Sequence, residues 1–360
     1  MGPRKEPAVK KDSTKRAEVV GMDVGDKDNQ ACGLNAAGKI VWERRIANTV
    51  AGLGGVFKSL PPCRVVIEAG GHARWITELI EGFGHEVKVV NPRKMRRIYE
   101  NENKSDVVDA RELADAGLCR WDRLPLAYLR KKEDQEKLSV LKSRDLMVRS
   151  RTGMVNLVRS LLKHEGVRVP KCGPEAFPKR AAGLVPEGLQ VAIEPLLKEI
   201  AALTERVREL DKWIEATAKN DPGVQSLLQV QGVGPVTSAA YVWTMSDPER
   251  FQKSRRVGSY LGLRPKRDQS GETDKQLPIT KAGNAYIRRL LVSCAQYIVG
   301  RHGKDCDLRR WGLKLAERGG KRAKRKAVVA VARKLAVLLH HLWITGEEYE
   351  PFHSRDRAAA

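Results

Sequence analysis

The sequence predicts an α/β domain with a mixed sheet, followed by a mainly all-α remainder. Three observations carry this prediction. Between residues 17 and 128, short apolar runs alternate with segments of helical periodicity. Between residues 131 and 219, apolar residues recur every three to four positions over two long stretches, as in long helices. After residue 221, helical patterning continues and glycine-containing turns interrupt it.

The predicted sheet begins with three strands that short polar turns connect, which is typical of an antiparallel meander. Two later strands alternate with helices. The resulting order, β-β-β-α-β-α-β-α, is that of an RNase H-like (RuvC-like) mixed sheet. The strands are expected at residues 18–23, 29–35, 40–46, 64–68 and 86–91, and the helices at 50–60, 73–81 and 105–117.

Two long helices are expected next, at residues 131–164 and 195–219, with the second beginning at Pro195. Each carries a continuous apolar stripe, which favours a helical hairpin or coiled coil that projects or dimerises. A helical bundle packed on its own domain is the alternative. The stripes consist of Val140, Met147, Met154, Leu161, Leu141, Val148, Val155 and Leu162, and then of Leu196, Ile200, Leu203, Val207, Leu210 and Ile214.

The end of the chain is very basic. Nine Lys or Arg residues lie between Arg309 and Lys326, and an apolar helix is expected at Ala327–Trp343. At the other end, residues 1–16 are charged and are expected to form a disordered arm. The domains predicted from these patterns are 1–16, 17–128, 129–220, 221–300 and 301–360.

The charge balance indicates a polyanionic partner. The chain has 67 Lys and Arg against 44 Asp and Glu, a net charge of +23, and the cations are spread over its whole length. Such an excess is typical of proteins that bind nucleic acid. No membrane partner is expected, because we find no apolar run of spanning length and no basic amphipathic helix beside an apolar anchor.

The cysteines and histidines predict a cytoplasmic protein without a zinc site. The six cysteines form no CxxC pair, and the N-terminus lacks the apolar core of a secretory signal. The histidines show no ligand spacing. His340 and His341 are adjacent on an expected helix, so their side chains should point in different directions.

Four acids occupy the positions where an RNase H-like fold needs carboxylates. Asp23 ends the first strand, Glu68 ends the fourth, and Asp106 and Asp109 share one face of the last helix. A single Asp after a strand is usually a turn or cap residue, so the joint placement carries the prediction. Oxygen ligands in this number suit Mg²⁺ or Mn²⁺, and two such ions can promote attack on a phosphodiester.

Other segments are candidates for contact with a phosphate backbone. Lys104 and Arg111 flank the paired aspartates, which fits a phosphate-binding rim and equally fits ordinary charge balance. Gly232 and Gly234 lie in a junction that resembles a helix-hairpin-helix, whose backbone N–H groups can hold a phosphate, although a plain helix–helix turn explains it equally well. Three further candidates in the segment 279–289 are Lys281, Asn284 and Arg288.

The pair Ser270-Gly271 is a polar turn when judged by its residues alone. No adjacent histidine offers a base. A nucleophilic role for Ser270 would therefore need activation by nearby Arg or Lys, or by the metal site of another subunit.

Together these segments resemble one family, the DEDD-type transposases of the insertion sequence 110 group, including its 1111 branch. The match spans about residues 17–300, in the family's order and spacing. Ser105 stands where threonine is frequent in the family, and the two ends of the chain fall outside the match. The segments that carry the resemblance are Gly21-Met-Asp-Val-Gly25, Ile67-Glu-Ala-Gly70, Lys104-Ser-Asp-Val-Val-Asp-Ala-Arg111, Gln231-Gly-Val-Gly-Pro235, Gly262-Leu-Arg-Pro265, Ser270-Gly271 and Ile279-Thr-Lys-Ala-Gly-Asn284.

The resemblance implies a RuvC-like catalytic domain, a coiled-coil insertion and a C-terminal transposase domain. It maps the family's acids onto Asp23, Glu68, Asp106 and Asp109, which bind two Mg²⁺ (or Mn²⁺) ions, and its nucleophile onto Ser270, which becomes covalently linked to DNA. Its implied partners are duplex DNA at the element ends and target, a guide (bridge) RNA encoded in the element, and further copies of the chain, as a dimer or a tetramer on DNA. The setting is the nucleoid of a bacterium or archaeon.

Two other functions stay open at this point. A metal-dependent nuclease of the junction-resolvase type would use the same acids with water as the nucleophile, and Ser270 would be a turn residue. A non-catalytic architectural nucleic-acid-binding protein would need none of the acids, and clustered negative charge would weaken its hold on phosphates. A transposase is the function we expect.

Overall fold

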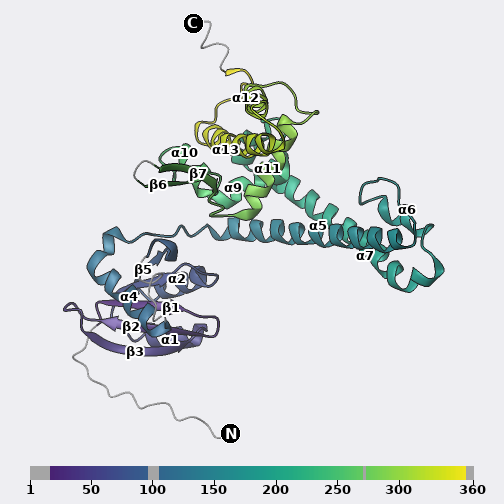
Figure 1. The fold of residues 1–360 in the computed structure, drawn as a ribbon. Coiled ribbons are helices and arrows are strands. Elements are labelled where there is room, and N and C mark those ends of the chain that lie inside the picture. Colours follow the sequence, from purple (N-terminus) through teal and green to yellow (C-terminus); the bar gives the residue numbers. More distant parts are fainter. Residues whose placement is uncertain (1–16, 96–104, 271–272, 354–360) are drawn as a thin grey trace, which may run out of the picture. The chain divides into compact units, whose positions relative to one another are not determined.

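A five-stranded mixed sheet lies at the centre of the N-terminal part of the chain (Figure 1). The computed structural model describes residues 17–95, 105–270 and 273–353, and the chain forms two units, residues 1–129 and 130–360. The predicted arm, Lys104 and Gly271 lie outside the described residues. The sheet belongs to unit 1. The finer subdivision of unit 2 into three domains stays a prediction.

The strand order is β3-β2-β1-β4-β5, and the order of elements along unit 1 is the predicted one. β1 (Val19–Val24), β2 (Asp28–Leu34) and β3 (Ile40–Ala47) pair antiparallel, as a meander. β4 (Arg64–Glu68) pairs parallel with β1, and β5 (Glu86–Val90) pairs parallel with β4. Each strand boundary lies within one residue of the predicted one. This mixed sheet with its helices fits an RNase H-like domain.

Helices cover both faces of the sheet. α1 (Val50–Phe57) and α2 (Ala73–Glu81) share one apolar cluster with the side chains of Val20 and Met22. α4 (Asp106–Arg120) covers the other face, where its side chains cluster with Val19 and Val66 of the strands. Because side chains alternate along a strand, this division assigns every other residue of β1 and β4 to the face of α4.

Unit 2 begins with a hairpin of two long helices, α5 (Lys132–His164) and α7 (Gln190–Lys219), which carries the short α6 (Phe177–Ala182) at one end (Figure 1). α7 begins five residues before Pro195, so the predicted start was wrong. Proline removes one helical N–H donor, but burial of Ile193 against the α5–α6 cluster extends the helix past it. The hairpin packs within one chain, and its role in dimerisation stays a prediction.

The rest of unit 2 packs around α9 (Pro235–Met245), which is buried from Thr237 to its end. Its core includes Leu308, Val331 and Leu335 from the basic C-terminal region. The other elements are α8 (Pro222–Leu228), α10 (Arg255–Tyr260), α11 (Ala285–Val299), α12 (Asp307–Ala316), α13 (Lys321–Thr345), β6 (Pro265–Ser270) and β7 (Thr273–Ile279).

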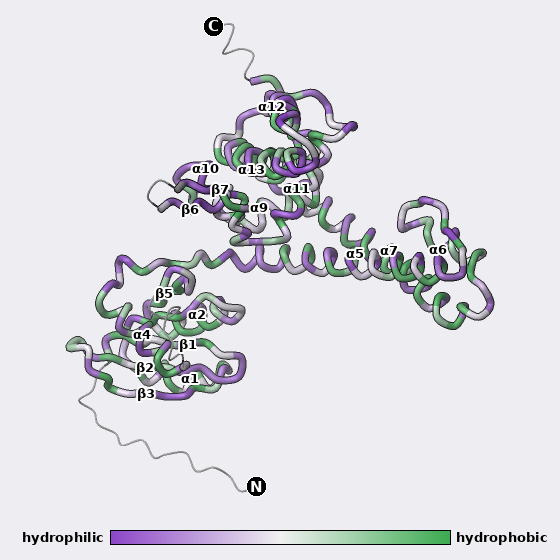
Figure 2. Tube along the Cα trace, viewed as in Figure 1, coloured by the Kyte–Doolittle hydropathy of each residue, from purple (hydrophilic) through white to green (hydrophobic). Residues whose placement is uncertain are grey.

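The β6–β7 hairpin was not expected from the sequence, which predicted a mainly helical region here. Its strands pair antiparallel. The residues of β6 that follow Pro265 are exposed and hydrophilic (Figure 2). A hairpin whose described side chains are mostly exposed lacks the apolar alternation that reveals most strands. A bidentate ion pair between Arg267 and Asp274 joins its strands.

α13 also departs from expectation. In the described part of the chain, α13 is the one helix whose length and composition would allow it to cross a membrane. The sequence analysis expected no apolar run of that length. The apolar side of the helix is buried in the core of unit 2, with Val331, Leu335 and Leu339 fully inaccessible. The core helix of a folded unit meets the same criterion, and that is the role α13 has here.

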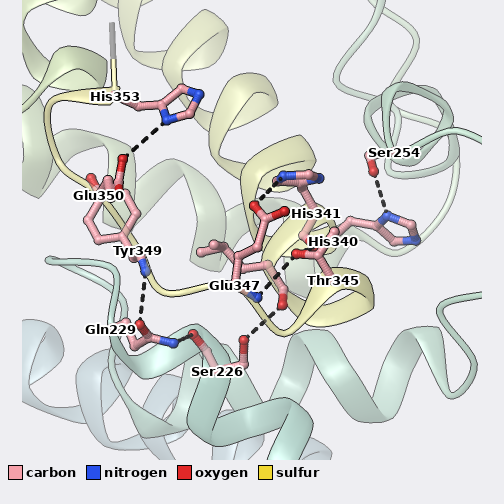
Figure 3. Close-up of polar contacts among 11 residues, drawn as sticks. Ser226, Gln229, Ser254, His340, His341, Thr345, Glu347, Tyr349, Glu350 and His353 are labelled. Carbon is pink, nitrogen blue, oxygen red and sulfur yellow. Dashed lines mark hydrogen bonds and ion pairs between the residues drawn. The ribbon is translucent and has the colours of Figure 1, made fainter. Parts of the chain in front are cut away.

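The two adjacent histidines of α13 point in different directions, as predicted (Figure 3). His340 is buried, and its ring donates to the carbonyl oxygen of Pro248 and accepts from the hydroxyl of Ser254. His341 is exposed and contacts Glu347. Burial lowers the pKa of His340, and the neighbouring His341 lowers it further, against the contact with Pro248.

Candidate functional site

Two of the predicted acids, Asp23 and Glu68, lie at the same end of neighbouring parallel strands. The last paired residues of β1 and β4 are Met22 and Ile67, so the acids are the next residues along each strand. Their faces follow from the alternation of side chains. Asp23 shares its face with Val19, and Glu68 with Val66, which cluster with residues of α4. Both acids therefore lie on the α4 face of the sheet.

Close backbone packing places the start of α4 beside this end of the sheet. A Cβ atom at Gly21 would lie 2.2 Å from the oxygen of Ala110 and 2.2 Å from the nitrogen of Ala114, so only glycine allows this approach. Farther along the helix, Gly117 packs on Val19 in the same manner. α4 therefore runs opposite to β1, and its first turn lies beside the carboxyl end of that strand.

The first turn of α4 carries the other two acids. Asp109 is 3% exposed, whereas Asp106, one turn earlier, is exposed. The hydroxyl of Ser105 caps the helix by accepting from the backbone N–H of Val108. This capped N-terminus favours negative charge, because the helix dipole is positive there.

All four carboxylates thus share one face and one end of the sheet. Their oxygen atoms are the ligands that Mg²⁺ and Mn²⁺ prefer, so the residues present fit such ions. As the side chains stand, no group of three His, Cys, Asp or Glu in the described part of the chain is close enough to hold a metal ion. The fold brings the backbones together, and side-chain rotation would have to complete a ligand set.

Arg111, predicted to lie on the phosphate-binding rim, is engaged within unit 1. Its guanidinium donates two hydrogen bonds to Glu43 of β3, at 2.5 and 2.8 Å. These bonds lower the pKa of the Glu43 carboxyl. Burial raises the pKa of the neighbouring Cys32 thiol to about 11, with Glu43 adding to the rise, which keeps that thiol protonated at neutral pH. A phosphate contact at Arg111 would therefore have to compete with Glu43.

A histidine–aspartate pair at the acid-bearing end was missed by the sequence analysis. His72 follows β4 and precedes α2, while Asp26 follows β1. The ring of His72 accepts from the indole N–H of Trp75 at 3.1 Å, so its other nitrogen carries the proton and points to Asp26 at 3.5 Å. The usable signal was positional, since both residues follow the two strands that end in predicted acids.

Ser270 ends β6 at the tip of the exposed β6–β7 hairpin, in unit 2. It pairs with Thr273 of β7, and because Gly271 lies outside the described residues, the polar turn at Ser270-Gly271 stays a prediction. No histidine occurs in either strand. The structure therefore presents the Ser270 hydroxyl to solvent on an element without a neighbouring base of that type.

The base of this hairpin is held by two loops that cross each other closely. Gly262 has φ +68°, and a Cβ atom there would lie 2.2 Å from the oxygen of Ala282. Arg288 donates to the carbonyl oxygens of Leu261 and Ala282, at 3.0 and 2.8 Å, and so ties both loops together. Asn284 caps α11 by accepting from two backbone N–H groups. Arg288 and Asn284 thus have structural partners, and Lys281, with φ +55°, shows no ion pair in the described chain.

Gly232 and Gly234 lie in the turn between α8 and α9, as predicted. Gly232 has φ +85°, and a Cβ atom there would meet the ring of Tyr297 at 2.8 Å, which explains one glycine by packing. Gly234 is the residue before α9, and no atom lies within 4 Å of a Cβ placed there. An open backbone at a helix start is compatible with phosphate contact, which stays a prediction.

Comparisons with known proteins identify the family of the chain. The DEDD transposase model of the IS110 group matches residues 20–165, and the model described as "Transposase IS116/IS110/IS902 family" matches residues 224–310. A "Transposase for insertion sequence element IS1111A" from Coxiella burnetii is 29% identical over 353 residues, 94% of this chain and 92% of that protein. A "Probable family 20 transposase" from Pseudomonas aeruginosa is 30% identical over 343 residues, 92% of this chain and 98% of that protein. This chain therefore belongs to the IS110 family of DEDD transposases, enzymes that cut and rejoin DNA.

Proposed function

We propose that this transposase moves an insertion sequence with two half-sites: a carboxylate half-site, Asp23, Glu68, Asp106 and Asp109, and a serine half-site, Ser270. One observation carries the proposal. β1, β4 and α4 place all four acids on one face and at one end of the sheet. A family match on each unit supports the pairing of the two half-sites in one enzyme.

The carboxylate half-site holds the divalent metal on which DEDD transposases generally depend. Two ions of Mg²⁺ or Mn²⁺ would, when bound, polarise the phosphodiester and stabilise charge on the leaving oxygen. Asp23 and Glu68 lie on strands that are paired on both sides, which fixes their backbones. Asp109 is itself buried at the start of α4, and exposed Asp106 has room to rotate toward a ligand. The backbones of these three acids are thus held in place, so only side-chain rotation is needed to assemble the site, which limits the cost.

The serine half-site supplies the nucleophile. The Ser270 oxygen attacks the phosphorus of a DNA phosphodiester, an O–P bond to serine forms, and a P–O bond to the sugar breaks. The proton that leaves the serine hydroxyl is balanced by protonation of the freed sugar oxygen. Attack by another DNA hydroxyl on the same phosphorus reverses the exchange and rejoins the strand to a new partner.

The two half-sites lie on different units, so a complete site requires that both come together. We propose that they come from different subunits of a dimer, which assembles into a tetramer on DNA. The α5–α7 hairpin supports this, because large apolar side chains are exposed along it: Leu146 is 57% exposed and Leu157 is 49% exposed. Exposed apolar residues on a long helix are suited to burial against a second helix.

The substrate we propose is duplex DNA at the ends of the element and at its target, with a guide RNA from the element selecting both. The net charge of +23 supports contact with more than one polyanion. The two relatives described above are named as transposases, which favours strand transfer over water-mediated cleavage of the junction-resolvase type.

A protein–DNA adduct tests the proposal. Purified protein, Mg²⁺, labelled DNA that spans the element ends and RNA from the element's flank are combined and run on a denaturing gel. We expect an adduct with the wild type and with the control Ser139→Ala, which changes an exposed serine of α5. Ser270→Ala and Asp109→Asn should form none. Cut DNA without an adduct, unchanged in Ser270→Ala, would make water the nucleophile and reduce Ser270 to a turn residue.

A further inference from the structure

A strongly basic surface on α12 and α13 has no role in the proposed chemistry. It runs over the end of α12, the turn that follows and the first two turns of α13, and all its cations are exposed. The only acid between residues 314 and 326 is Glu317, which leaves a net charge of +6. We name it the α12–α13 basic surface, and its cations are Lys314, Arg318, Lys321, Arg322, Lys324, Arg325 and Lys326.

These cations are not balanced within the chain. None of the seven makes an ion pair with a residue in the described ranges. Five of them stand at the start of α13, where the helix dipole disfavours positive charge and the first turn holds no acid. α7 is different, because its five cations are interspersed with six acids. Charge of this kind does not stabilise the fold and fits an external polyanion.

The surface stands on a firm support. From Ala327 onward, α13 buries its apolar side in the core of unit 2. Its C-terminal half is tied to α8, since Ser226 donates to the carbonyl oxygen of Leu342, and the segment after α13 is tied to the turn after α8, where Gln229 accepts from the N–H of Tyr349 (Figure 3). Five of the seven cations are therefore carried on a helix whose position is fixed at its other end, which favours contact with a rigid ligand.

The composition of the surface selects the polyanion. No large apolar or aromatic side chain between residues 301 and 343 is exposed in the structure, so there is no platform on which unpaired bases stack. A membrane partner is disfavoured as well, because the apolar side of α13 is occupied by the core. Long, flexible cations without stacking partners fit the outside of a double helix, where only phosphates and sugars are presented.

We propose that the α12–α13 basic surface binds the backbone of duplex DNA without reading its sequence. The choice of DNA rests on the proposed function, in which duplex DNA is the substrate. Contacts of this type hold a duplex in place and leave recognition of sequence to other elements. The surface lies outside the serine and carboxylate half-sites, so it adds affinity and contributes no group to the chemistry.

The test is the salt dependence of binding. Full-length protein is titrated with a duplex of unrelated sequence, without metal, between 50 and 300 mM salt. Neutralising Lys321, Arg322, Arg325 and Lys326 to Gln should make the slope of log K against log salt shallower by about 3.6, since each lost phosphate contact contributes about 0.9. Affinity at about 0.1 M salt should fall by at least about tenfold. A change in slope below about 1 would overturn the proposal.

A matched control removes equal charge elsewhere in unit 2. Lys179, Lys198, Lys212 and Lys219 are exposed on α6 and α7, and their change to Gln should leave the slope within about 1 of the wild type. An equal loss in this control would show a general charge effect and overturn the assignment, as would a loss confined to an RNA duplex of the same length. Thermal unfolding confirms that both variants fold. Because no cleavage is measured, failure of the serine chemistry would appear only in the adduct assay.

Discussion

The two proposed half-sites are built in opposite ways. Asp23 and Glu68 stand on two strands, β1 and β4, that are each paired on both sides, and Asp106 and Asp109 stand on a helix packed so closely that Gly21 admits no side chain. Ser270 stands at the tip of a two-stranded hairpin whose outer residues are exposed and which pairs with no third strand in the described sheets. A lone two-stranded hairpin is only marginally stable in water, whereas a five-stranded sheet packed between helices is stable by itself.

The difference shows which of the two proposed half-sites the fold holds in place by itself, and that is the carboxylate half-site. Metal-binding carboxylates repel one another, so a rigid scaffold has to hold them near each other. The proposed nucleophile stands on an exposed hairpin, so DNA would have to place it. The carboxylate half-site should therefore respond to small changes of backbone packing, and the serine half-site mainly to changes at the base of its hairpin.

The largest effect should come from the carboxylates themselves. Asp23→Asn and Glu68→Gln should each lower the single-turnover cleavage rate by about 10³-fold or more, because several kcal/mol of transition-state stabilisation depend on the metal they hold. Glu18→Gln is the control, since Glu18 is an exposed acid just before the other end of β1. Rates within about threefold of wild type in the first two variants would contradict the assignment.

Next in size is the loss of the close approach between β1 and α4. Gly21→Ala places a Cβ atom 2.2 Å from two backbone atoms of α4, so the helix has to shift. We expect unit 1 to lose about 2–3 kcal/mol of stability, measured by hydrogen exchange of the β1 and α4 amides. Gly55→Ala in α1 meets no atom within 4 Å and should be neutral or slightly stabilising. Equal protection in both variants would mean that α4 is not held as described.

The third effect tests the serine half-site. Gly262→Ala forces φ +68° on a residue with a side chain and brings its Cβ within 2.2 Å of Ala282. Adduct formation should fall by 10- to 100-fold, because a displacement of about 1 Å is sufficient for such a loss. Gly153→Ala, at an open position of α5, is the control. Binding of duplex DNA should be unchanged in both variants. An adduct yield equal to that of the wild type in Gly262→Ala would mean that the loops at the base of the hairpin do not position Ser270.

The same difference decides what the sequence could predict. The strands of unit 1 were predicted to within one residue, because short apolar runs between turns record buried strands, and the acids then followed from strand ends and helix spacing. β6 and β7 were missed, since their exposed strands record no such face. The pairing of Arg111 with Glu43 joins residues that are 68 positions apart, which no local pattern reveals. The start of α7 was misplaced because packing of Ile193 outweighed the local preference of Pro195.

The smallest effect concerns α13, the buried helix of unit 2. As a packed element it should behave like the sheet of unit 1 and unlike the β6–β7 hairpin. Burial lowers the pKa of His340, so the unfolded chain binds its proton more readily than the folded one. The contribution of His340 to the free energy of unfolding is therefore fully present above the pKa of histidine in the unfolded chain, about 6.5. It is lost as the pH falls below that value, by at most about 1.4 kcal/mol per pH unit. Urea midpoints between pH 5 and 7 measure this loss. His340→Gln should flatten the profile relative to wild type, whereas His341→Gln, at the exposed neighbour, should keep it. The reverse pattern would mean that the buried histidine does not hold α13 to the chain around Pro248 and Ser254.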